Sequence, residues 1–144
     1  MHRYSQEKVL TYTSKQLFNI IIDVEKYPEY LPWCKGAEIV KKNDKYNFDA
    51  KLIVGYRSIN ETYTSKVTSR YLTQIDSNAI EGPFSYLESS WKFKDINNKK
   101  CKVKFFIDYE FKSFILGKLM GSLFKKASEK MFYAFETRAR DLHG

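Results

Sequence analysis

The sequence predicts one domain of the α+β class, in which a curved antiparallel sheet of about seven strands wraps around a long C-terminal helix. Three observations support this prediction. Apolar residues recur at every second position between residues 36 and 112, they recur at helical spacing from residue 116 onward, and a chain of 144 residues has room for one core. We expect the domain to span residues 1–144.

The first part of the chain predicts a strand followed by one or two short helices. Residues Arg3 to Leu10 form the predicted strand, and Ser14 is a favourable N-cap for the helix that follows. The apolar residues of this helix repeat at helical spacing: Leu17, Phe18, Ile21 and Ile22. We expect the helix to end near Val24.

The segment from Glu25 to Cys34 reads EKYPEYLPWC and is too interrupted to form a regular element. Its prolines block a continuing helix and favour extended geometry at the residues that precede them. Its aromatic residues give it an apolar surface. We interpret the segment as a lid over a gap between the curled sheet and the long helix. The alternative is that it closes one end of an ordinary core.

Alternating apolar and polar residues predict the strands of the sheet. The residues expected to face the core recur along four segments: 48–54, 59–67, 87–93 and 103–111. Turn signals separate these segments, at residues 41–44, 54–57, 81–83 and 96–100. The clean alternation favours an antiparallel meander with one buried face and one solvated face.

The last part of the chain predicts a long helix of roughly seven turns. No glycine or proline interrupts the run from Ser122 to Leu142. Apolar residues spaced three or four apart form its stripe: Leu116, Met120, Leu123, Ala127, Met131, Ala134 and Leu142. A deeply curved sheet and a single helix leave space between them, so we expect a cavity there.

The formal net charge of +8 and the isoelectric point near 9.3 allow attraction to phosphates, either of nucleic acid or of anionic lipid. Several basic residues lie on the predicted long helix: Lys118, Lys125, Lys126 and Lys130. Such a run is most often a solvated face, and the alternative is contact with lipid headgroups or ribosomal RNA phosphates. No motif predicts sequence-specific binding of nucleic acid.

Residues for catalysis or metal binding are sparse. His2 and His143 lie at the chain ends, and the common hydrolase, metalloprotease and phosphate-loop motifs are missing from the sequence. Cys34 and Cys101 are far apart, and we interpret Cys34 as a buried structural thiol. We therefore predict a protein that is not an enzyme and that requires no metal and no cofactor.

Glu61 is the polar residue of greatest interest, because it shares a predicted inward strand face with Ile59, Tyr63 and Val67. A buried carboxylate must be paired, hydrogen-bonded or protonated. Glu61 could hold a polar headgroup or a quinone oxygen inside the cavity. Alternatively, it pairs with Arg57 or a lysine, or a bulge turns it outward.

Three segments together resemble the coenzyme Q-binding START-domain family. They are DVEKYPEYLPWC at 23–34, KVTS at 66–69 and EGPFSYLESSWKF at 81–93. This family includes the bacterial ribosome-association toxins and belongs to the polyketide cyclase/START-like superfamily, whose members have the helix-grip fold. The resemblance covers essentially the whole chain.

The resemblance implies a hydrophobic tunnel between the sheet and the last helix that holds ubiquinone or a similar lipid. The protein would then be a non-enzymatic quinone carrier or chaperone that supports respiration. The residues implied at the mouth are Tyr27, Tyr30, Leu31 and Trp33. Those implied on the sheet side are Phe84, Leu87 and Trp91, and those on the helix side are Leu119, Leu123 and Met131.

A second function stays open from the same resemblance, namely binding to the large ribosomal subunit so that subunit association is blocked. The chain shows no secretory signal, and it starts directly at its first predicted strand without a transit peptide. Its longest apolar run, Phe114–Phe124, is too short to cross a bilayer. We expect a bacterial cytoplasmic protein, with peripheral contact to the anionic inner face of the membrane.

Overall fold

The computed structural model describes residues 2–144 and contains one seven-stranded sheet in the order β1-β7-β6-β5-β4-β3-β2. All neighbouring strands are antiparallel. The strands are β1 (His2–Leu10), β2 (Cys34–Asp44), β3 (Asn47–Tyr56), β4 (Ile59–Arg70), β5 (Gln74–Glu81), β6 (Phe84–Asp95) and β7 (Cys101–Phe111). The predicted α+β class with a seven-stranded meander is confirmed.

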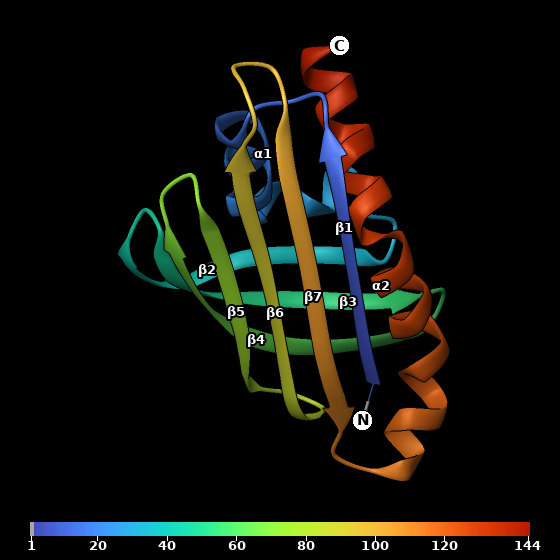
Figure 1. The fold of residues 1–144 in the computed structure, drawn as a ribbon. Coiled ribbons are helices and arrows are strands. Elements are labelled where there is room, and N and C mark those ends of the chain that lie inside the picture. Colours follow the sequence, from blue (N-terminus) through green and yellow to red (C-terminus); the bar gives the residue numbers. More distant parts are fainter. Residues whose placement is uncertain (1) are drawn as a thin grey trace.

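The sheet is strongly curved. Figure 1 shows β2, β3 and β4 crossing behind β5, β6, β7 and β1, while the long helix α2 (Phe114–His143) runs along the open side. Register shifts interrupt the β2–β3 ladder, the β4–β5 ladder at Thr64 and Ser65, and the β6–β7 ladder at Phe84 and Tyr86. Such bulges increase the local twist, so the sheet can curl around a single helix.

Helix α1 (Ser14–Ile22) begins one residue before the position predicted from the sequence. Its N-cap is Thr13, which forms a capping box with Gln16, because each side chain bonds to the other residue's backbone N–H. Ser14 has a different role. Its N–H and hydroxyl donate to the Asp95 carboxylate at 2.9 and 2.8 Å, which fixes α1 to the end of β6.

The predicted lid segment is more regular than its prolines suggested. Its first half forms the 3-10 helix η1 (Val24–Glu29), in which Pro28 is accommodated. The N–H groups of Tyr30 and Leu31 both donate to the carbonyl of Tyr27, at 3.1 and 2.8 Å. These bonds turn the chain sharply and direct it into β2.

Helix α2 extends further toward the N-terminus than the uninterrupted run of residues 122–142 indicated. It starts after Ser113, whose hydroxyl accepts the N–H of Leu116 as an N-cap. Gly117 and Gly121 therefore lie inside the helix, although each glycine costs about 1 kcal/mol of helix propensity.

Two aromatic groups fill the ends of the core between α2 and the inner face of the sheet. At one end Phe84 packs against Phe124, with ring centroids 5.0 Å apart. At the other end Trp91 stacks on Phe105 at 4.4 Å and meets Phe135 edge-on at 5.2 Å. The space between these two groups is the candidate site.

Candidate functional site: an apolar chamber between the sheet and α2

Two apolar cavities lie between the inner face of the sheet and α2, with volumes of about 90 and 50 Å³. The two cavities adjoin, because four residues line both of them: Tyr63, Leu87, Ile107 and Met131. We refer to the two cavities together as the inner chamber.

Residues from several helices and strands form the walls of the larger cavity. Ile21 of α1 and Val24 and Tyr27 of η1 cover one side, and α2 contributes Met131 and Phe135. The remaining wall comes from inward-facing residues of β3–β7: Ala50, Leu52, Tyr63, Ser65, Val67, Ile75, Ser77, Leu87, Ser89, Trp91, Phe105 and Ile107.

The smaller cavity lies next to a groove on the molecular surface. Trp33, Val54 and Ala127 are among its walls, and Leu123 lines both the cavity and the groove. That groove, the outer groove, has a volume of about 420 Å³. Its walls are Tyr56, Ile59, Leu119, Met120, Ser122, Leu123 and Lys126, from the β3–β4 turn and the N-terminal half of α2.

The structure brings six of the predicted ligand-contacting residues to the inner chamber: Tyr27, Trp33, Leu87, Trp91, Leu123 and Met131. Leu119 lies further out, in the outer groove, with 54% of its surface exposed. The periodicity of α2 places it on the same side as Leu123, but it lies at the edge of the buried face, since its neighbour Met120 is only 1% exposed.

The other predicted residues support the walls from behind. Tyr30 packs edge-on against Phe135, at 5.6 Å between ring centroids, and the Arg138 guanidinium lies 4.7 Å above the Tyr30 ring. Leu31 is fully buried beneath η1, and Phe84 belongs to the aromatic group at the far end of the core. These three residues do not line the inner chamber.

Glu61 is half-buried and pairs with Val54 in the β3–β4 ladder. It does not line the inner chamber, and in the described part of the chain it makes no ion pair with Arg57 or with a lysine. The Arg57 guanidinium instead lies over the Tyr56 ring. Glu61 sits close to the β3–β4 turn, which explains why its inward strand face does not bring it to the chamber.

Four serines supply hydroxyl groups to the chamber walls, a feature that we did not single out from the sequence. One of them, Ser128 of α2, donates its hydroxyl to the backbone carbonyl of Phe124 at 2.7 Å. Ser77 and Ser89 lie opposite each other on β5 and β6, and their hydroxyl oxygens are 2.7 Å apart. Ser65 on β4 is only 2% exposed, and its hydroxyl has no hydrogen-bond partner. The available signal was a serine at an inward position of an otherwise apolar strand.

The chamber contains no permanent charge. Its walls include no Asp, Glu, Lys, Arg or His side chain. Burial raises the pKa of the Tyr27 and Tyr63 hydroxyls well above their usual value, so both stay protonated. The Tyr27 hydroxyl already donates to the backbone carbonyl of Ile21.

Both cysteines are buried, which confirms the interpretation of Cys34 as a buried thiol. Burial raises the pKa of Cys34 to about 11, and it does the same for Cys101. A thiol with such a pKa is protonated at neutral pH and is a poor nucleophile. In residues 2–144 no group of His, Cys, Asp and Glu is placed to hold a metal ion.

The predicted basic residues of α2 are all exposed, and among them only Lys126 lines the outer groove. A second basic cluster lies on the outer face of the sheet, where Lys92 pairs with Lys104 and Lys94 pairs with Lys102. Glu7 bridges to Lys102 and Lys104 at 2.7 and 3.6 Å. We call these four lysines the sheet lysines.

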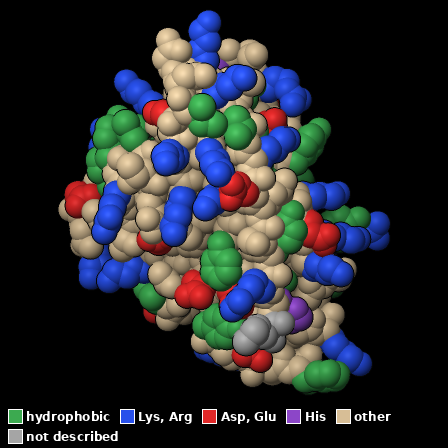
Figure 2. Space-filling view, in the orientation of Figure 1, with side chains coloured by type: hydrophobic (Ala, Val, Ile, Leu, Met, Phe, Trp, Pro, Cys, Tyr) green, Lys and Arg blue, Asp and Glu red, His purple; other side chains and the backbone are tan. Residues whose placement is uncertain are grey.

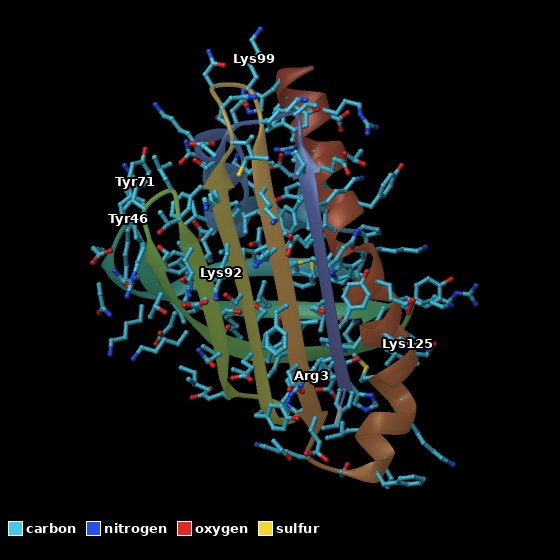
Figure 3. All side chains as sticks on the ribbon, in the orientation of Figure 1. Arg3, Tyr46, Tyr71, Lys92, Lys99 and Lys125 are labelled. Carbon is cyan, nitrogen blue, oxygen red and sulfur yellow. The ribbon has the colours of Figure 1, made fainter. Side chains whose placement is uncertain are left out.

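Figure 2 shows Lys and Arg side chains spread over this outer face. In Figure 3, Lys92 lies over β6 on the face toward the viewer, whereas Lys125 lies on α2. The two basic surfaces are therefore separate. The structure contains no helix long and apolar enough to cross a membrane among the described residues.

The comparisons with known proteins agree with this geometry. Residues 10–136 match the family model described as polyketide cyclase / dehydrase and lipid transport. The chain belongs to this family. A ribosome association toxin, RatA, from Rickettsia prowazekii is 38% identical over 99% of both chains.

A second relative is the mitochondrial coenzyme Q-binding protein COQ10 of Dictyostelium discoideum. It is 35% identical over 95% of this chain and 68% of its own length. A START superfamily protein from Mycobacterium smegmatis has a TM-score of 0.83 over 99% of both chains at 21% identity, which shows the shared fold. The predicted START-like fold is confirmed.

Proposed function

We propose that this protein binds a neutral hydrophobic ligand in the inner chamber, with ubiquinone as the leading candidate. The observation that carries the proposal is an uncharged apolar chamber, which shares the wall residue Leu123 with a groove on the molecular surface. The name of the COQ10 relative supports the choice of a quinone. In this role the protein is a carrier or chaperone for the ligand.

The sizes of the two spaces match the two parts of such a ligand. The cavities of about 90 and 50 Å³ are together about as large as the 150 Å³ apolar cavity that binds benzene. The combined volume is therefore close to that of a site for one small ring, and it excludes a long tail. The outer groove, of about 420 Å³, offers apolar surface for the tail, and its burial contributes roughly 25 cal/mol per Å².

A binding role fits the chamber better than catalysis. The family description includes cyclases and dehydrases, whose chemistry needs acid and base groups converging on one substrate atom. The ionisable groups in the chamber walls are the tyrosines Tyr27 and Tyr63, and burial keeps both protonated. These are hydrogen-bonding groups rather than general bases.

The two tryptophans of the chain, Trp33 and Trp91, both lie in the chamber walls and provide the test. A short-chain ubiquinone that enters the chamber is expected to quench their fluorescence saturably. Ala127→Leu should fill the smaller cavity and abolish saturable quenching. Ala134→Leu, the same change on the same helix away from the chamber walls, is the matched control. Equal quenching in the two variants would contradict the proposal.

Organic extraction of the purified protein followed by mass spectrometry gives an independent test. We expect a co-purifying quinone in the wild-type protein and its depletion in Ala127→Leu. A wild-type extract without any apolar compound, combined with no saturable quenching, would rule out the binding function.

The N-terminal half of α2 suggests how the ligand is loaded. Phe114 and Ile115 are 77% and 70% exposed, and the Lys118 ammonium lies 5.0 Å above the Phe114 ring. Exposed apolar residues flanked by lysines favour peripheral docking on an anionic bilayer. We expect the protein to co-sediment with phosphatidylglycerol vesicles more than with phosphatidylcholine vesicles.

A matched pair of variants tests this docking surface. Ile115→Ser should reduce co-sedimentation with anionic vesicles. Tyr133→Ser, at a position on the same helix that is 65% exposed but lies further along it, should leave co-sedimentation unchanged. Equal losses in both variants would show that the effect is not specific to this end of α2.

The RatA relative supports a second candidate function, association with the large ribosomal subunit. The sheet lysines add an observation in its favour, since like charges directly opposite each other on neighbouring strands destabilise a sheet. A polyanion such as ribosomal RNA would offset that repulsion. Two basic surfaces are available, the sheet lysines and the α2 residues Lys125, Lys126 and Lys130.

Salt-dependent co-sedimentation with large subunits distinguishes these surfaces. We expect neutralisation of Lys125, Lys126 and Lys130 to glutamine to weaken binding, and we compare it with the same change at Lys92, Lys94 and Lys104. Loss in only one triple variant identifies the contact surface. Unchanged sedimentation in both would exclude this function for the two surfaces.

A further inference from the structure

We propose that the inner chamber receives an uncharged ring bearing a carbonyl group, that the Ser65 hydroxyl donates a hydrogen bond to this carbonyl, and that the ligand's tail leaves through the outer groove. This inference rests on the proposed binding function. It defines the chemical class of the buried headgroup and the direction in which the ligand lies.

Ser65 is a buried polar residue of the chamber wall whose hydroxyl has no hydrogen-bond partner. Its side chain lines the larger cavity, it is 2% exposed, and its hydroxyl has no partner. A buried hydroxyl without a hydrogen bond is costly, so an acceptor inside the chamber would satisfy it. Ser77 and Ser89 line the same cavity, but their hydroxyls bond to each other.

Tyr63 provides a second hydroxyl beside Ser65. It lies two residues earlier on the same face of β4 and lines both cavities. The structure shows no hydrogen bond from its hydroxyl to any described residue, whereas Tyr27 already donates to Ile21. Burial raises the pKa of the Tyr63 hydroxyl, so the group remains a donor.

The turn between β5 and β6 holds Tyr63 in place. Gly82 in this turn has a φ of +130°, and a Cβ added there would lie 2.5 Å from the Tyr63 Cβ. The glycine therefore allows the turn to pack directly against the tyrosine. The turn thereby restricts the position of the Tyr63 Cα and Cβ atoms beside the two cavities.

The chamber walls contain no charged side chain among the described residues, and this argues against a ligand with a charged headgroup. No cationic side chain lines the chamber, so a buried carboxylate or phosphate would lose its hydration without gaining a partner. The nearest lysine in the pathway is Lys126, which lines the outer groove. A bound fatty acid would therefore place its carboxylate in the outer groove. A quinone would lie in the opposite direction, with its headgroup in the inner chamber.

The test uses ubiquinone with one isoprene unit as the probe and palmitate as its charged counterpart. The affinity of each ligand is measured by tryptophan fluorescence, and the carbonyl stretching band of the bound quinone by infrared difference spectroscopy. In wild-type protein we expect a carbonyl band at lower frequency than in an apolar solvent. Ser65→Ala should return the band toward the solvent value and weaken quinone binding about 3- to 10-fold, which corresponds to one hydrogen bond.

Ser90→Ala is the matched control. The Ser90 hydroxyl is also buried and unpartnered, but Ser90 lines a groove on the outer face of the sheet rather than the chamber. It should leave both the affinity and the carbonyl band unchanged. Both unliganded variants should melt at the wild-type temperature or above, because each loses an unsatisfied hydroxyl, so weakened binding in Ser65→Ala cannot be ascribed to misfolding.

The outcomes separate this inference from the function on which it rests. If wild-type protein binds no quinone, the proposed function fails, and the inference fails with it. If quinone binds but Ser65→Ala leaves its carbonyl band and affinity unchanged, the function stands and the headgroup assignment is wrong. Palmitate that binds as tightly as the quinone and is weakened to the same degree by Ser65→Ala would place its carboxylate at Ser65, and this would also overturn the assignment of an uncharged headgroup.

Discussion

The two halves of α2 carry similar apolar stripes but have different surroundings. In the C-terminal half, Phe132, Phe135 and Ala139 are fully buried, and the Phe135 ring meets Tyr27 of η1 at 5.4 Å. In the N-terminal half, Ile115 and Leu119 are largely exposed. The difference comes from the covering elements, since α1 and η1 reach only the C-terminal half (Figure 1).

The two halves of α2 therefore have different roles. The covered half closes the core and gives the domain its stability, because burial of large apolar side chains is the dominant favourable contribution to folding. The open half also buries Met120, Phe124 and Ala127, but it leaves Leu119 exposed in the outer groove. Changes at the buried residues of the covered half should therefore alter the free energy of unfolding, and changes at the exposed residues of the open half should alter binding of the ligand's tail.

The largest expected effect is at Phe135. Phe135→Ala removes an aromatic ring that contacts Tyr27, Tyr30 and Trp91, and it should lower the free energy of unfolding by about 3–5 kcal/mol. Urea unfolding monitored by circular dichroism measures this loss. Tyr133→Ala, two residues away on the exposed side, should change it by less than about 0.5 kcal/mol. Similar losses at the two positions would contradict the burial of the Phe135 side chain.

The burial of Cys34, which lies at the start of β2, is tested by measuring the free energy of unfolding as a function of pH. Burial raises its pKa from 9.0 to about 11, so the folded state holds the thiol proton more tightly than the unfolded state does. The resulting stability is fully present below pH 9 and is lost as the pH rises toward 11. We expect Cys34 to account for about 2 kcal/mol of that loss.

Cys34→Ala isolates this contribution from the other effects of high pH on stability. The variant should lose less stability between pH 8 and pH 11 than the wild-type protein in urea unfolding experiments. Parallel curves for the two proteins would show that Cys34 is not protected by burial.

The open half is tested by Leu119→Gln. The side chain is already 54% exposed, so the free energy of unfolding should change by less than about 0.5 kcal/mol. Affinity for a ubiquinone with a long isoprenoid tail should fall about 3- to 10-fold, because the tail loses apolar contact in the groove. Affinity for the one-isoprene ligand should be unchanged, and equal losses for both ligands would argue against a tail in this groove.

The smallest effect is expected at the surface of the covered half. Lys8 of β1 and Glu136 of α2 form an ion pair at 2.9 Å, and both side chains are partly solvated. Glu136→Gln should therefore reduce stability by no more than about 1 kcal/mol, and the reduction should shrink in high salt. Thermal unfolding at low and high ionic strength checks this. A larger, salt-independent loss would mean that Glu136 acts through packing.

The sequence predicts the architecture well because the relevant signals are local. Period-two alternation locates the strands, and the aromatic residues Tyr27, Trp33 and Trp91 do reach the chamber walls. The start of α2 was harder to place, since its capping residue Ser113 overrides two unfavourable glycines.

The polar chemistry of the site was less predictable. Glu61 and Ser65 share one strand face, but only Ser65 lies where the covering elements close over the sheet. Which inward residue is truly enclosed depends on η1 and α2, which are distant in sequence from β4. The sheet lysines were missed for a related reason, because Lys92 and Lys104 become neighbours only through the β6–β7 register.

The most direct test of the central claim is to locate a bound ligand by nuclear Overhauser effects in isotope-labelled protein saturated with a short-chain ubiquinone. We predict contacts from the quinone ring to the Met131 methyl group and the Trp91 indole, and contacts from the isoprenoid protons to the Leu119 methyl groups. Ring contacts confined to the outer groove, or no contact with Met131 and Trp91 at saturation, would contradict an internal binding chamber.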